Sequence, residues 1–139
     1  MPATPRNAAQ GALALGLTLA LLAAGCGSGA TLSAKALLQE AKSLRSEAAE
    51  GALLAQDAAA GRTTRIYTRV HSADLYKAAS QAASSLQKAK TTPALEPKLR
   101  RTARLAQKVS ADLKRLGHAP RTEQRTLARE LTAAAKELK

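Results

Sequence analysis

Residues 95–117 read LEPKLRRTARLAQKVSADLKRLG, and this stretch decides the fold class. Apolar or small side chains recur along it every three or four residues, at Leu95, Leu99, Thr102, Ala106, Val109, Leu113 and Leu116. This spacing places them on one face of an α-helix. Pro97 suits the first turn of a helix, and Gly117 suits its C-terminal cap. The sequence therefore predicts an amphipathic helix over about residues 94–116.

Three further stretches have the same spacing, with Ala replacing many of the Leu residues. They predict helices over about residues 32–60, 62–90 and 120–138. Their expected inward stripes are Leu37, Ala41, Leu44, Ala48, Gly51, Ala55 and Ala58, then Leu75, Ala79, Ala82, Leu86 and Ala89, then Leu127, Leu131, Ala134 and Leu138. Ser33 and Thr122 are the expected N-caps. Gly61 and the run 91–93, which ends in a proline, separate the segments.

The helices are joined by short connections, which favour antiparallel neighbours. A chain of 139 residues is long enough for one domain. We therefore predict an all-α, up-down antiparallel four-helix bundle over residues 32–139, preceded by a leader. A three-helix arrangement with a loose fourth helix is the alternative. Residues 27–139 contain 26 Ala and 16 Leu, so the buried apolar area is small and the stability should be modest.

The first 25 residues have the pattern of an export signal. Arg6 lies in a short polar segment, and residues 11–25 are Leu, Ala and Gly apart from Thr18. This uncharged run is shorter than the roughly 20 residues that a membrane-spanning helix needs. A cleaved signal peptide is therefore the preferred interpretation, and a retained membrane anchor is the alternative.

The end of this leader, Leu22-Ala23-Ala24-Gly25-Cys26, resembles the lipobox of bacterial lipoproteins. Ala23 occupies the position at which that class most often has Leu. The resemblance covers only the leader. It implies that signal peptidase II recognises residues 22–25, that Cys26 is acylated, and that Cys26 becomes the new N-terminus. The alternative is a core cysteine at the end of an apolar helix.

The resemblance divides the chain into a signal peptide over residues 1–25, an acylated cysteine with a short tether over 26–31, and the helical bundle. It also implies a location at the cell membrane, lipid-anchored on the extracytoplasmic face, either periplasmic or at the cell surface. Two or three acyl chains are enough for stable attachment to a bilayer.

Positive charge dominates the mature part. The formal net charge of the chain is +12. Seven basic residues on the second and third predicted helices are candidates to face a polyanion: Arg62, Arg65, Arg69, Arg100, Arg101, Arg104 and Lys108. Anionic lipid, an envelope polymer or a protein partner would fit such a surface. Nucleic acid is not expected, because the leader implies export and no stacking aromatics accompany the cations. The alternative is a solvated helix face.

One cluster resembles a small site. Tyr67, His71 and Asp74 lie at positions i, i+4 and i+7 of the second predicted helix, on one face. They are candidates for a small ligand or a metal, although a polar cluster that satisfies its own hydrogen bonds is the more common outcome. On the same helix Ile66, Val70 and Ala73 project opposite to the inward stripe. Either the helix bends near Ser72, or its first half contacts something else, and the patch is then a bundle edge, a dimer contact or a partner site.

Catalytic signals are missing from the sequence. No nucleophile elbow, metalloprotease motif or nucleotide-binding loop occurs, and a single Cys excludes a disulfide framework. We expect no enzyme, no cofactor and no metal. The expected function is a lipid-anchored, non-catalytic interaction or scaffolding module. The alternative is a binding module for a small ligand or metal around Tyr67, His71 and Asp74.

The lipobox resemblance predicts a specific precursor. In cells treated with a signal peptidase II inhibitor, the chain should accumulate acylated on Cys26 but uncut, because cleavage follows acylation. Mass spectrometry of the Cys26 peptide measures this, and Cys26→Ser is the control that should be neither acylated nor cut. An unmodified chain that begins at Met1 in untreated cells would contradict the lipoprotein interpretation.

Overall fold

The computed structural model describes residues 31–139, which form four helices and no strand. The helices are α1 (Ala34–Ala59), α2 (Arg65–Lys88), α3 (Glu96–Leu116) and α4 (Arg121–Glu137). The prediction of an all-α fold with four helices is confirmed for this part of the chain. The predicted signal peptide, Cys26 and the start of the tether lie outside the described residues. Between residues 31 and 139, no helix combines the length and apolarity required to cross a bilayer.

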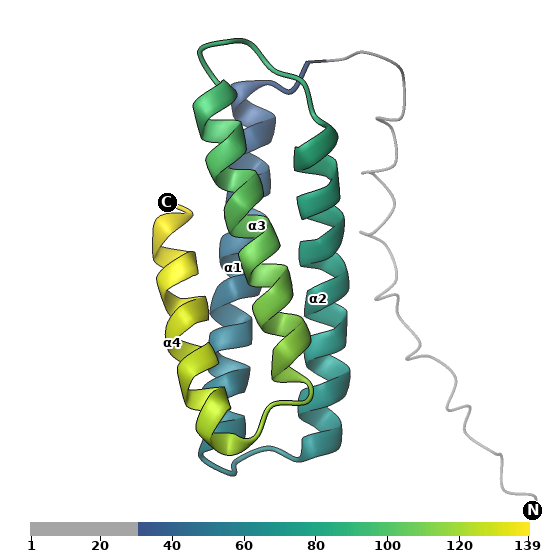
Figure 1. The fold of residues 1–139 in the computed structure, drawn as a ribbon, viewed down its shortest axis with the longest axis vertical. Helices are drawn as coiled ribbons and strands as arrows, with labels where there is room; N and C mark the ends of the chain where they lie inside the picture. The colour runs from purple at the N-terminus through teal and green to yellow at the C-terminus, as the bar shows by residue number, and fades with distance from the viewer. Residues whose placement is uncertain (1–30) are drawn as a thin grey trace, which may run out of the picture.

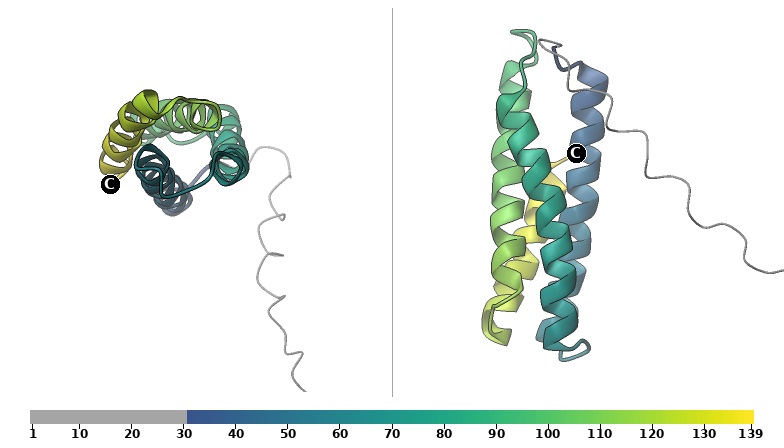
Figure 2. Two further views of the ribbon diagram at one scale, coloured as in Figure 1. Left: turned by 90° about the horizontal axis from the view of Figure 1, so that it is seen from below. Right: turned by 90° about the vertical axis from the view of Figure 1, so that its right-hand side faces the viewer.

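Consecutive helices alternate in direction, and they surround a common core (Figure 1). Seen from one end, they form a ring in the order α1, α2, α3, α4 (Figure 2). The closest pairs are α1 with α4 and α2 with α3. The fourth helix is therefore docked rather than loose. It is the shortest helix and stops well before the end of the bundle where α1 begins, so that end contains only three helices (Figure 1).

Local capping sets the helix boundaries. The Ser33 hydroxyl accepts a hydrogen bond from the Ala36 N–H at 3.2 Å, as predicted for an N-cap. The Thr64 hydroxyl accepts from the Tyr67 N–H at 3.2 Å, so α2 begins at Arg65 and not at residue 62. The prediction for Thr122 is wrong. Pro120 occupies the N-cap position of α4, and Thr122 lies inside the first helical turn.

The inward stripes meet in one core. All seven stripe residues predicted on the first helix are buried, as are all four on the last. On the second helix Ala82 and Ala89 are only partly buried. The tightest approach is at Gly51 of α1, where an added Cβ would collide with Leu113 Cδ2 and lie 3.3 Å from Leu131 Cδ1. The missing side chain therefore lets α1, α3 and α4 come together at one point.

The entry of the chain into the bundle is fixed by two hydrogen bonds. The Leu32 N–H donates to the Lys90 carbonyl at 2.7 Å, and the Thr91 hydroxyl donates to the Leu32 carbonyl at 2.8 Å. Leu32 is thereby held on the loop between α2 and α3, 59 residues away in sequence from Thr91. The chain enters the bundle at its three-helix end.

The close packing at Gly51 predicts that replacing this helical glycine with a larger residue lowers the stability, although the new residue has the higher helix propensity. Gly51→Val should lower the free energy of unfolding by about 1–3 kcal/mol, because the added methyls overpack a fully buried site. Helix propensity alone would favour Val over Gly by a few tenths of a kcal/mol. Urea unfolding followed by helical circular dichroism measures the effect. The exposed Ala49→Val is the matched control and should cost less than about 0.7 kcal/mol. A Gly51→Val protein as stable as the parent would refute the close packing.

Candidate functional site

The predicted cluster on α2 is only partly assembled. The Tyr67 and His71 rings stack, with their centroids 5.5 Å apart and their planes inclined by 21°. Asp74 does not join them, because its carboxylate lies 3.7 Å from the Lys77 ammonium. His71 Nε2 instead lies 2.7 Å from Glu50 Oε1 on α1. The His71–Glu50 contact links α1 and α2 at the surface, and sequence spacing on a single helix could not reveal it.

This cluster is open to solvent. Tyr67 is 56% exposed, and the side chains of His71 and Glu50 are 34% and 54% exposed. Between residues 31 and 139, no three or more His, Cys, Asp and Glu side chains are grouped so that they could hold a metal ion. The geometry fits a hydrogen-bonded bridge between two helices better than a pocket that encloses a ligand.

The first turns of α2 carry an exposed apolar patch. Ile66 is 69% exposed and Val70 is 57% exposed, while Ser72 is buried on the opposite side. The helix runs unbroken from Arg65 to Lys88. It therefore continues through Ser72 without burying these side chains, which stay at the surface. The chain has a single Ile and only two Val, so placing Ile66 and Val70 outside the core is a costly use of large apolar residues.

The seven basic residues predicted to face a polyanion do not form one surface. Arg62, Arg65 and Arg69 lie where α1 ends and α2 begins, whereas Arg100, Arg101, Arg104 and Lys108 lie on α3, from its second turn to just past its midpoint. Gly117, at the end of α3, lies beside Arg69, so Lys108 is about 14 Å from Arg69 along the bundle axis and Arg100 about 26 Å, at 1.5 Å per residue. Both separations exceed the Debye length of about 8 Å at physiological salt, so the two groups are largely screened from each other.

Several of these cations already have carboxylate partners. Arg62 lies 2.6 Å from Asp57, Arg100 lies 2.9 Å from Glu96, and Lys108 lies 3.1 Å from Asp112. Arg101 lies at 3.9 Å from Glu137. Within the part of the chain that the structure describes, Arg65, Arg69 and Arg104 form no ion pair. No carboxylate of the described residues offsets the charge of these three side chains.

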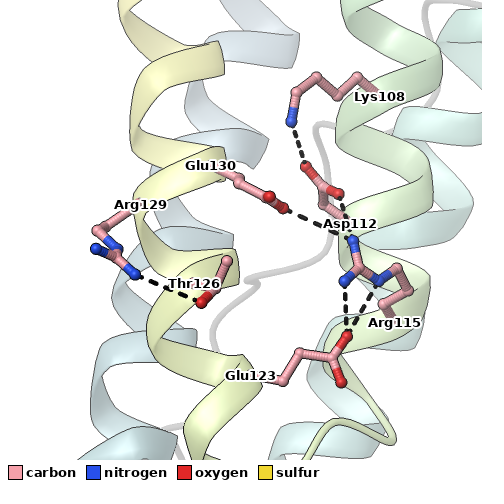
Figure 3. Close-up of polar contacts among 7 residues, drawn as sticks. All are labelled: Lys108, Asp112, Arg115, Glu123, Thr126, Arg129 and Glu130. Atoms are coloured by element: carbon pink, nitrogen blue, oxygen red, sulfur yellow. Dashed lines mark hydrogen bonds and ion pairs between the residues drawn. The ribbon is translucent and has the colours of Figure 1, made fainter.

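Helix α4 contains basic residues that the sequence analysis missed. Its acidic residues turn toward α3, where Glu123 and Glu130 lie 2.7 and 3.7 Å from the Arg115 guanidinium. Figure 3 shows these carboxylates on one side of α4 and Arg129 on the other. Arg125, Arg129 and Lys136 line a groove between α4 and α1. A net charge counted over the whole helix conceals this separation. The spacing of four and seven residues between the three cations was the signal that could have revealed it.

The polar contacts between α3 and α4 centre on a buried carboxylate. Asp112 is only 4% exposed, and it accepts a hydrogen bond from the Lys108 ammonium at 3.1 Å. Arg115 lies 3.5 Å from the same carboxylate and also bonds Glu123, so it links Asp112 to α4 (Figure 3). Burial raises the pKa of Asp112, and the hydrogen bond from Lys108 only partly opposes this effect. This arrangement joins two helices, and each of its three carboxylates lies within 4 Å of a cation.

Comparison with known proteins gives no further guide, since no family model, curated protein or solved structure matches the chain. Arguments about function therefore come from the residues and their geometry.

The raised pKa of Asp112 predicts how one variant changes with pH. The native state holds the Asp112 proton more tightly than the unfolded state does. The contribution of this group to stability is therefore complete below the ordinary Asp pKa of about 3.9 and is lost as the pH rises through the native pKa. Asp112→Asn, which stays neutral, should be at least as stable as the parent at pH 7 and should lose this advantage near pH 4.

Urea unfolding of both proteins at the two pH values measures this difference. The pKa of Glu47 is also raised by burial, but Glu47 is common to both proteins and cancels in the comparison. An Asn variant that is less stable at pH 7 and equal to the parent at pH 4 would mean that Lys108 and Arg115 outweigh the desolvation of Asp112.

Proposed function

We propose that the protein is a small lipid-anchored protein of the bacterial cell envelope that acts as a non-catalytic interaction or scaffolding module. The resemblance of residues 22–26 to a lipobox supports the anchor and the extracytoplasmic location. The helical bundle, with its charged ends and its exposed apolar turn, supports a role in interaction.

The observation that carries the proposal is the attachment of Leu32 to the loop between α2 and α3. Leu32 bonds Lys90 and Thr91, so the path from Cys26 meets the bundle at its three-helix end. The six residue steps from Cys26 to Leu32 span at most about 20 Å when fully extended. We call this end of the bundle the base: the first turn of α1, residues 88–95, and the first turn of α3. An acylated Cys26 would keep the base close to the bilayer.

The charge of the base suits an anionic membrane. It exposes four lysines, Lys35, Lys88, Lys90 and Lys98. Glu96 is the acidic residue of the base, and Arg100 pairs with it. Each Lys or Arg close to an anionic bilayer contributes on the order of 1 kcal/mol. The base is therefore suited to rest on anionic head groups once the lipid anchor has brought it there.

The opposite end, which we call the tip, consists of residues 60–70 and 117–121. In this orientation it points away from the bilayer. It exposes Ile66, Tyr67 and Val70 beside two cations without partners, Arg65 and Arg69. An apolar turn flanked by positive charge fits a protein partner with an apolar contact and acidic neighbours. A membrane at the base and a partner at the tip together would make the protein a scaffold.

Two labelled variants test this orientation. In the acylated protein reconstituted in vesicles that contain phosphatidylglycerol, a fluorophore on Ala94→Cys at the base should be quenched by head-group quenchers. The same fluorophore on His118→Cys at the tip should not be quenched, because it lies about 30 Å or more away along the helices. Steady-state fluorescence is the measurement.

Charge reversal supplies the controls. Lys88→Glu, Lys90→Glu and Lys98→Glu together should reduce quenching at the base, since they remove its attraction to lipid. Arg65→Glu, Arg69→Glu and Lys77→Glu make the same change in charge elsewhere and should leave quenching unaltered. Equal quenching at base and tip would show that the bundle lies flat, which would refute the proposed orientation. A protein that does not enter the vesicle fraction would refute the anchor.

A further inference from the structure

A groove of about 740 Å³ runs between α1 and α4 along the outside of the bundle. Four cations line it: Arg62 after α1, and Arg125, Arg129 and Lys136 from α4. The groove contains no Asp or Glu among its lining residues. It lies on a different face from the base, which α4 does not reach (Figure 1).

The cations of the groove are available to an external anion. Within residues 31–139, Arg125, Arg129 and Lys136 form no ion pair, and the nearest polar contact of Arg129 is the Thr126 hydroxyl at 3.5 Å. Only Arg62 has a carboxylate partner, Asp57, at 2.6 Å. The acidic residues of α4 that could have neutralised these cations pair instead with arginines of α3. Glu123 and Glu130 lie 2.7 and 3.7 Å from the Arg115 guanidinium, and Glu137 lies 3.9 Å from Arg101.

Arg125, Arg129 and Lys136 form a row along α4, and their spacing suits an extended ligand. At 1.5 Å per residue, Arg125 and Arg129 are about 6 Å apart along α4, and Lys136 lies about 10 Å further. A single small anion would reach at most two of these side chains. A linear polymer with repeated negative charges would contact the whole row.

The residues at the floor of the groove indicate which kind of polymer could bind. It consists largely of alanine methyl groups, including those of Ala59 and Ala128, together with Gln56 and Thr132. Protein contacts depend on a few large buried side chains. No large apolar side chain lines the groove, so it offers no such anchor for a peptide. No aromatic ring is present on which a nucleic-acid base could stack. Three of the four cations are Arg, whose planar guanidinium binds phosphate through paired hydrogen bonds.

We propose that the groove between α1 and α4 binds a linear phosphate polymer without aromatic bases, of the polyol-phosphate or inorganic polyphosphate kind. Arg125, Arg129 and Lys136 contact phosphates spaced along the polymer, and the alanine floor admits a thin chain. This site is independent of the lipid anchor and of the base, since it uses neither Cys26 nor the lysines around residue 90. It adds a ligand to the scaffold that the previous subsection proposes.

Binding measured without lipid tests the site. The full chain in a neutral detergent is titrated at physiological salt with inorganic polyphosphate, a glycerol-phosphate oligomer, orthophosphate and poly-glutamate, and the affinities are compared by calorimetry. We expect at least one phosphate polymer to bind and orthophosphate to bind far more weakly. The polymer that binds more tightly then shows whether the ligand is of the polyol-phosphate or the polyphosphate kind. Tighter binding of poly-glutamate than of either phosphate polymer would overturn the proposal in favour of an acidic peptide.

Matched variants separate the groove from the overall positive charge. Arg125→Glu, Arg129→Glu and Lys136→Glu together should weaken binding of the phosphate polymer by roughly tenfold or more, equivalent to about 1.4 kcal/mol. Lys77→Glu, Arg104→Glu and Lys114→Glu change the net charge equally on α2 and α3, away from the groove, and should weaken it much less. Equal losses in the two triple variants would mean diffuse attraction to a basic protein and would overturn the proposal.

A steric variant tests the groove without changing its charge. Ala133 is exposed and lines the groove, so Ala133→Trp should obstruct it and weaken binding while the helicity stays the same. Ala111→Trp places the same side chain at an exposed position of α3 and should bind as the parent does. Unaltered binding by the Ala133→Trp protein would show that the polymer does not enter the groove.

Discussion

Close approach of the helices at small residues is the constraint on which the rest of the structure depends. At Gly51 the backbone of α1 leaves no room for a Cβ, because Leu113 of α3 and Leu131 of α4 fill the space. A core assembled from Ala and Leu has few large side chains to fill gaps, so its helices must come close for the apolar atoms to touch. The same small side chains then lie at the surface between helices, which is why the groove between α1 and α4 has a floor of alanine methyl groups.

The separation of charge follows from this packing. Once α4 has one neighbour on each side, each of its faces meets a different environment. The face toward α3 meets Arg115 and Arg101 and carries the three acidic residues, whereas the groove face keeps Arg125, Arg129 and Lys136. A helix with a small net charge thus presents a face that is purely basic. Asp112 is buried between the helices, and there too the charge has partners nearby, because Lys108 and Arg115 on the same helix pair with it.

The sequence was sufficient for the helices and for most of the core, because both depend on periodicity that is local to each segment. Leu99, Val109 and Leu113 are buried as their spacing predicts, and Ser33 caps α1 as expected. Thr122 was assigned wrongly because Pro120, with its fixed φ, also suits the residue before a helix, and side-chain capping preference does not choose between the two. The sequence did not predict which side chains on different helices contact each other. His71 bonds Glu50, which lies 21 residues earlier, and only the packing of α1 against α2 brings them together.

The hydrogen bonds that hold Leu32 also determine how the bundle carries mechanical load. Force applied to the chain from the N-terminal side of Leu32 acts first on the Lys90 carbonyl and the Thr91 hydroxyl, and not on the first turn of α1 alone. The load is therefore shared by α1 and by the loop that joins α2 to α3. Unwinding of α1 from its start requires both of these bonds to break first. A bundle held at this point resists peeling of its first helix, although alanines are as numerous as leucines in its core.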